Sequence, residues 1–230
     1  MEALRKRFQN SPEFARVAPL VIFAALTALQ GEGLKDLLGK GAEYWVYLFK
    51  TGVGVWLIWE MRPFVQEMRW RISWAAVVVG VAVFALWVGL DGLYPRLSKI
   101  EPGAGWNPFM QFGHGSALGW LCVLGRLAGS SLVVPPLEEV FYRSFLYRYF
   151  VKIDFRAMPL GRFHALSFFV TSLLFGLMHP DRWVAGILCG LAYQWLVLRK
   201  NRLGDAMTAH GITNFLLGLW VVWRGAWSFW

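Results

Sequence analysis

The stretch SSLVVPPLEEVFYRSF, from Ser130 to Phe145, places two adjacent carboxyls and a guanidinium inside an apolar part of the chain. An ionisable side chain in a membrane-spanning segment costs about 2.5–3.5 kcal/mol, and such residues usually face a cavity or a partner. Glu139 and Arg143 are four residues apart, so on a helix they meet on one face and suit an ion pair. Glu138 points about 100° away around the same helix. The stretch therefore predicts one paired carboxyl and one that is free to point elsewhere.

The composition of the whole chain is typical of a membrane protein. Of 230 residues, 57% are hydrophobic and 16% are charged, whereas soluble domains have about 45–50% apolar and about 25% charged residues. The net charge of +9 is spread over short loops between apolar segments, which encodes membrane topology and argues against a nucleic-acid partner. Cys122 and Cys189 both lie in apolar runs, so we expect no disulfide framework. These features predict an all-α, polytopic membrane helix bundle.

About seven segments have the roughly 17–25 apolar residues that a bilayer requires. They centre on Val17–Leu29, Tyr44–Trp59, Ile72–Leu90, Ser116–Val134, Phe163–Met178, Trp183–Leu198 and Ala206–Val222. A further helical piece, Pro136–Phe150, either continues the fourth segment or forms a separate short helix after the Pro135-Pro136 pair. The sequence therefore predicts seven or eight transmembrane helices.

We predict a single membrane domain with two parts. Residues 1–90 supply N-terminal transmembrane helices, and residues 115–222 supply the core that carries the chemistry. Between them lies Asp91–Phe112, the longest polar stretch containing Pro and Gly. All the unusual polar residues in apolar segments that suggest a site follow this stretch.

The basic residues predict the orientation of the bundle. With the N-terminus in the cytoplasm and Pro136–Phe150 continuing the fourth segment, fourteen basic residues fall in cytoplasmic loops and six on the opposite side. The six are Lys35, Lys40, Arg96, Lys99, Arg182 and Arg224. Because Lys and Arg are in excess on the cytoplasmic side of membrane proteins, this bias favours a cytoplasmic N-terminus and an uncleaved first helix.

Two more apolar segments carry polar residues. SLLFGLMHP places His179 at the end of a helix, four residues after Phe175. DAMTAHGITNFLLG places His210 and Asn214 four residues apart, so both can donate hydrogen bonds toward the same point. Taken singly, the three clusters are explained by a polar cap at the membrane edge, a dipole-stabilised helix end and an inter-helical hydrogen bond.

Taken together, the three clusters suit a hydrolytic site. Activation of water needs a general base, and a carboxylate or imidazole in a low-dielectric pocket can be tuned for that task. Hydrogen-bond donors are needed where oxyanion charge develops, and a His/Asn pair on one helix supplies them. The sequence contains neither a GxSxG nor an HExxH pattern, so serine-hydrolase and zincin motifs are absent.

The order and spacing of the clusters resemble a known family. EExxxR at Glu138–Arg143, FxxxH at Phe175–His179 and HxxxN at His210–Asn214 are similar to the three motifs of the CPBP family, and the resemblance covers roughly residues 115–222. These intramembrane glutamic endopeptidases include CAAX prenyl proteases and bacteriocin-processing enzymes. The compact, Trp-rich chain also resembles the CAAX-protease-related branch associated with exosortase systems.

The resemblance implies a function and a role for each matching residue. It implies peptide-bond hydrolysis by water that Glu138 and His179 activate, with an oxyanion site formed by His210 and Asn214. The supporting pair, Glu139 and Arg143, would hold the geometry. The implied substrate is a peptide or protein, lipidated or membrane-bound, and the implied location is a bacterial plasma membrane with its lipids. We expect no cofactor, although Glu138, His179 and His210 could supply three ligands to zinc, so the sequence leaves a metal open.

Two other classes of function remain open from the sequence. One is a non-catalytic immunity or scaffold protein that keeps the polar clusters for packing. The other is a small proton-coupled transporter that uses the same acids, although the two halves show no inverted repeat. Outside the motifs, Lys50 and Arg126 are cations inside apolar segments. Arg126 would contact a lipid or a substrate carboxylate, or extend to the membrane interface.

Overall fold

The computed structural model describes residues 2–30, 38–39, 41–98 and 105–230, and this part of the chain contains helices joined by turns and loops, without a strand. The longer helices are α2 (Pro12–Ala28), α4 (Ala42–Met61), α5 (Trp74–Gly89), α10 (Ala165–Leu177), α11 (Trp183–Lys200) and α12 (Gly204–Arg224). The predicted all-α class is confirmed. Three basic residues that entered the orientation argument, Lys35, Lys40 and Lys99, lie outside the described residues.

A single helix of 33 residues, Ala117–Tyr149, runs through the Pro135-Pro136 pair. It consists of α7 (Ala117–Ala128), a π-helical turn (Gly129–Val133), α8 (Val134–Glu139), a second π-helical turn (Val140–Leu146) and α9 (Tyr147–Tyr149). Pro136–Phe150 therefore continues the fourth predicted segment. The prolines are tolerated because the π-helical turn before them shifts the hydrogen-bond register, so that the Val134 N–H bonds the Gly129 carbonyl five residues back.

Two helices in the described residues are long and apolar enough to cross a membrane by length and composition. They are Ala117–Tyr149 and Gly204–Arg224, and the apolar helices α5 and α10 are shorter than a full span. The other segments predicted to span the membrane do fold as helices, namely α2, α4 and α11. By this measure the structure supports two spans, and the predicted total of seven or eight stays a prediction.

The outer faces of the helices carry large apolar side chains. Trp74 is 84% exposed, Trp59 66% and Phe49 63%. Water-soluble monomers rarely expose extensive apolar patches, whereas a lipid-facing surface is apolar and every backbone group beneath it is satisfied within a helix. The surface therefore suits contact with lipid.

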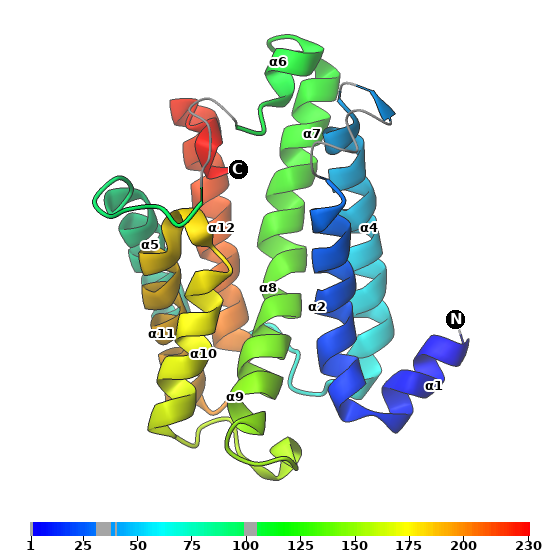
Figure 1. Ribbon diagram of the computed structural model, residues 1–230, viewed down its shortest axis with the longest axis vertical. Helices are drawn as coiled ribbons and strands as arrows, with labels where there is room; N and C mark the ends of the chain where they lie inside the picture. The colour runs from blue at the N-terminus through cyan, green and yellow to red at the C-terminus, as the bar shows by residue number, and fades with distance from the viewer. Residues whose placement is uncertain (1, 31–37, 40, 99–104) are drawn as a thin grey trace.

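The long helix lies between two groups of helices (Figure 1). On one side are α2 and α4, which pack against each other, and on the other side are α5, α10, α11 and α12. Within the second group, α10 packs on α11 and α12 packs on α5, while α4 and α12 both contact the long helix. The three motifs lie on the long helix, α10 and α12, so this packing brings them to the middle of the bundle.

The loops predicted to share one side of the membrane meet at one end of the bundle, which includes α1 (Glu2–Asn10) and the loop after α9 (Figure 1). Arg5 of α1 forms an ion pair of 2.6 Å with Glu60 at the end of α4. The N–H of Gly161 donates to Asn201 Oδ1, between α11 and α12, at 2.6 Å. The loops that gather at this end are those predicted to lie on the cytoplasmic side from their excess of Lys and Arg.

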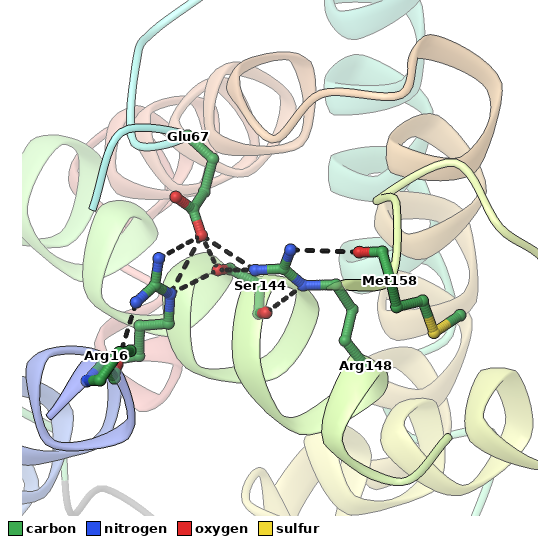
Figure 2. A network of polar contacts seen from close by, with 6 residues as sticks. Arg16, Glu67, Ser144, Arg148 and Met158 are labelled. Carbon is green, nitrogen blue, oxygen red and sulfur yellow. Dashed lines mark hydrogen bonds and ion pairs between the residues drawn. The ribbon is translucent and has the colours of Figure 1, made fainter. Parts of the chain in front are cut away.

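A shared carboxylate fastens this end of the bundle (Figure 2). Glu67 Oε1 accepts hydrogen bonds from Arg16 Nη2 on α2 at 2.8 Å and from Arg148 Nη2 on the long helix at 3.0 Å, and the Ser144 hydroxyl donates to the same oxygen. Burial alone would raise the pKa of Glu67, but Arg16 and the hydrogen bonds outweigh it and hold the pKa below its ordinary value. One acid thus ties the loop after α4 to two helices.

Replacing Glu67 by Gln is expected to lower the free energy of unfolding by about 3 kcal/mol, because it leaves two buried guanidinium groups without a counter-charge. Thermal unfolding of the purified protein in detergent measures the change. Glu13→Gln, which removes an exposed carboxyl at the start of α2, is the control and is expected to leave the unfolding temperature unchanged. Equal effects of the two variants would contradict the role given to Glu67.

The difference in stability between wild type and Glu67→Gln should depend on pH in one direction, becoming smaller in acid. Because the pKa of Glu67 is lowered by folding, its contribution to stability is complete above its ordinary pKa of 4.5 and is lost as the pH falls through the lower, folded value. The gap in unfolding temperature between wild type and Glu67→Gln should therefore be constant from pH 8 to pH 5.5 and shrink below about pH 4.5. A gap that widens in acid would be incompatible with this assignment.

Candidate active site

Glu139 lies at the centre of the polar cluster and is fully buried. Its Oε2 is 3.2 Å from Arg143 Nε, so the ion pair predicted from their spacing is present. Its Oε1 is 2.9 Å from His210 Nδ1 on α12. A single carboxylate therefore joins the first motif to the third, a contact between residues 71 positions apart.

Glu138 points away from this ion pair, as the 100° rotation between neighbours on a helix requires. Its side chain keeps 18% of its surface exposed, and its Oε2 is 3.9 Å from His210 Nε2. Among the described residues, no group is within hydrogen-bonding reach of that oxygen. Glu138 Oε2 is therefore a buried oxygen that forms no hydrogen bond within the described residues, and the exposed fraction belongs to other atoms of the side chain.

Aromatic contacts fix the His210 ring. The ring of Tyr193, on α11, stacks on it with centroids 5.1 Å apart and an interplanar angle of 25°, and Phe175 meets it edge-on at 6.0 Å. The Tyr193 hydroxyl donates to Thr213 Oγ1 at 2.7 Å. The sequence analysis did not identify Tyr193, because this residue belongs to none of the three motifs. Its hydrogen-bond partner Thr213 lies one turn after His210, on the helix that carries the third motif.

A carboxylate faces each ring nitrogen of His210. The Glu139 carboxylate can only accept, so the Nδ1–H of His210 donates to it. The opposite nitrogen, Nε2, faces Glu138.

His179 lies just after the C-terminal end of α10. Its Nδ1 is 2.9 Å from the Phe175 carbonyl oxygen, one turn back, and a carbonyl selects the tautomer with the proton on Nδ1. The Trp87 ring meets the imidazole edge-on, with centroids 5.4 Å apart. The Nε2 lone pair of His179 is therefore available as a proton acceptor.

Asn214 forms a structural hydrogen bond as well as lining the site. Its Nδ2 donates to the Ser130 carbonyl at 2.8 Å. That carbonyl has no helical donor, because the Val134 N–H bonds Gly129 and residue 135 is a proline without an N–H. One N–H of the Asn214 amide thus fastens α12 to the π-helical turn, and the second N–H remains for another acceptor.

The residues that the sequence singled out meet at one cavity of about 650 Å3. Its wall includes Glu138, His179, His210 and Asn214, which come from all three motifs. Within the part of the chain that the structure describes, no three or more His, Cys, Asp or Glu side chains are grouped as a metal site. The alternative of zinc held by Glu138, His179 and His210 therefore does not match this arrangement.

The two adjacent acids should respond differently to loss of charge. Glu139→Gln leaves the buried Arg143 without its counter-ion and is expected to lower the free energy of unfolding by about 3 kcal/mol. Glu138→Gln breaks no ion pair with Lys or Arg in the described residues and is expected to change it by less than about 0.5 kcal/mol. Thermal unfolding in detergent compares them, and a larger loss for Glu138→Gln would reverse the assignment of the paired and free carboxyls.

Comparison with known proteins identifies the segment that carries this cavity's motifs. Residues 120–216 match the model of a family described as type II CAAX prenyl endopeptidase Rce1-like. Comparisons with curated proteins and with solved structures gave no match. The matched residues include all three motifs, in agreement with the resemblance to CAAX proteases. Residues 120–216 are therefore similar to the Rce1-like family, which is a membrane-embedded protease family.

Proposed function

We propose that this protein is an intramembrane endopeptidase of the glutamic type. Glu138 and His179 activate the hydrolytic water, while His210 and Asn214 stabilise the oxyanion. The observation that carries the proposal is the single cavity whose wall holds all four side chains. The family match supports a peptidase acting on a protein or peptide.

The reaction begins with a water molecule between Glu138 and the substrate carbonyl. The free Glu138 carboxylate accepts a proton from the water, assisted by the Nε2 lone pair of His179, as the oxygen attacks the carbonyl carbon. The carbon–nitrogen bond then breaks, and the proton held at the site passes to the leaving amine. The products are a carboxylic acid and an amine, so the added water balances the reaction.

The third motif faces the negative charge that develops on the carbonyl oxygen. In the imidazolium form, His210 keeps its Nδ1–H on Glu139 and presents its Nε2–H to the cavity. The second N–H of Asn214 provides another donor beside it. Pre-positioned donors of this kind contribute more in the low-dielectric interior of a protein than in water. The supporting pair, Glu139 and Arg143, holds His210 in this orientation.

The proposal extends to the membrane context. We propose that seven helices cross a bacterial plasma membrane with the N-terminus in the cytoplasm, and that the substrate is lipidated or membrane-bound. The apolar outer surface and the gathering of basic loops at one end of the bundle support this arrangement. A prenylated CAAX peptide is one candidate substrate, because the matched family is described by that activity.

Mass spectrometry of membrane peptides tests the function and identifies the substrate in the same experiment. Cells carrying wild type, Glu138→Gln or an empty vector are compared, and we expect a product that only the wild type releases. Asp181→Asn, an equally small change to a carboxyl on the same cavity wall, is the matched control and should retain the product. The product should survive a strong chelator; loss on chelation would support a metal-dependent site instead.

Identical peptide sets from wild type and Glu138→Gln would overturn the proposed peptidase. That result would leave the polar cluster as packing in a scaffold or immunity protein. Substrate flux across sealed vesicles without cleavage would support the transporter alternative.

Asn214→Ala separates the catalytic role of the third motif from its structural one. Removal of one oxyanion donor lowers kcat by about 100- to 1000-fold, and we expect KM to change little. The unpaired Ser130 carbonyl should also lower the free energy of unfolding by about 1–3 kcal/mol. Steady-state kinetics and thermal unfolding are measured on one preparation. Reduced stability with unchanged kcat would show that Asn214 is only a helix fastener.

A further inference from the structure

The catalytic cavity has a second, cationic region. Its wall includes Lys50 of α4 and Arg126 of α7, away from the three motifs. Lys50 is only 4% exposed. Its Nζ donates to Thr27 Oγ1 at 3.1 Å and lies 4.7 Å from the centroid of the Tyr47 ring.

Arg126 is held by aromatic rings rather than by an acid. Its guanidinium carbon lies 4.8 Å from the Tyr47 ring centroid, 4.6 Å from that of Trp106 and 5.4 Å from that of Trp230. Cation–π contacts position a guanidinium without neutralising it. Among the described residues, neither Arg126 nor Lys50 forms an ion pair with a carboxylate.

Other buried basic side chains in the described part of the chain are neutralised. Arg16 and Arg148 pair with Glu67, Arg143 pairs with Glu139, and Arg182 pairs with Asp91. A buried charge without a partner is costly, so Lys50, at the same degree of burial, is an exception that calls for an anion. The cavity beside Lys50 and Arg126 is the space in which that anion can lie.

We propose that Lys50 and Arg126 bind the C-terminal carboxylate of the peptide substrate and so position it for cleavage near that end. This inference deepens the proposed peptidase function and rests on it. A guanidinium presents paired N–H donors that match a carboxylate, and the Lys50 ammonium adds a second charge. The cationic residues act by holding the substrate and take no part in the bond-breaking steps.

The spacing along the long helix limits where the bond is cut. Arg126 and Glu138 are twelve residues apart on one continuous helix, which is about 18 Å along its axis. An extended peptide spans at most about 3.3–3.6 Å per residue. A substrate anchored by its carboxylate at Arg126 therefore needs at least about five residues to reach Glu138, so the enzyme would release a C-terminal peptide of about that length or longer.

The position of Arg126 favours a peptide over a lipid headgroup. Arg126 lies on the wall of the cavity that also holds Glu138 and His210. A carboxylate of a substrate inside that cavity can reach it, whereas lipid headgroups lie at the membrane surface, outside the hydrocarbon region.

Binding of two forms of one peptide tests the proposal. The probe is a seven-residue apolar peptide with a fluorescent label at its N-terminus, prepared with a free C-terminal carboxylate and as the C-terminal amide. The Glu138→Gln protein in neutral detergent should bind the acid at least about tenfold more tightly than the amide. Adding Arg126→Gln or Lys50→Met should remove most of that preference by weakening binding of the acid alone.

The controls make each outcome decisive. Arg224→Gln removes an arginine that also lies over tryptophan rings but is outside the cavity wall, and it should keep the preference for the acid. The ratio of the two affinities is independent of the fraction of protein that is folded. Equal affinities, or no saturable binding of either form, would overturn the proposal. Displacement of the acid by phosphatidylglycerol vesicles, with no preference over the amide in their absence, would assign the region to lipid instead.

The binding readout is separate from the proposed function. It uses protein that lacks the proposed base, so a preference for the acid can be found even if no peptide is cleaved. Conversely, cleavage that depends on Glu138 but treats acid and amide alike would keep the peptidase and reject this role for Lys50 and Arg126.

Discussion

The site depends on the carboxylate that Glu139 shares between Arg143 and His210. A fully buried acid is tolerable only when its charge is compensated, and here a guanidinium and an imidazole compensate it from two different helices. The contact fixes the position of α12 against the long helix and the orientation of the His210 ring together. It also leaves Glu138 outside the ion pair with Arg143, which a catalytic base requires.

The same region shows how a helix can break its own hydrogen-bond pattern without ending. Two prolines remove two donors, and the π-helical turn before them moves the register so that the long helix continues. The Ser130 carbonyl left over by this change is satisfied by Asn214 of α12. Gly211 lies beside the next carbonyl, where a Cβ atom would come within 2.8 Å of the Ser131 oxygen. The irregular turn is therefore part of the helix contact that positions the third motif.

Local patterns in the sequence predicted much of this arrangement. Hydrophobic runs predicted the all-α class and the helices, and the four-residue spacing predicted the Glu139–Arg143 ion pair. The sequence does not decide whether the prolines end the helix, because the answer depends on a hydrogen-bond register that no spacing rule encodes. The number of membrane spans also stays a prediction, since several helices are shorter or less apolar than a full span.

Contacts between distant segments could not be predicted in the same way. The spacing rules that paired Glu139 with Arg143 act within one helix, whereas the bond from Glu139 to His210 and the stacking of Tyr193 on His210 depend on how α11 and α12 pack. The motif resemblance grouped Glu138, His179, His210 and Asn214 as one proposed site, and the shared cavity places them on one wall.

The cavity holds an acidic side chain, Glu138, and two basic side chains, Lys50 and Arg126, too far apart to form an ion pair. Within the described residues Glu138 has no Lys or Arg partner, and Lys50 and Arg126, which line the same cavity, have no carboxylate partner. About three turns of helix lie between Glu138 and Arg126, too far for an ion pair, so each charge remains available to a ligand. A peptide that places its carboxylate at the cations presents its backbone carbonyls toward Glu138 and His210. The polarity of the cavity thus defines a direction for the substrate, and this direction follows from residues on α4 and α7 that lie outside the three motifs.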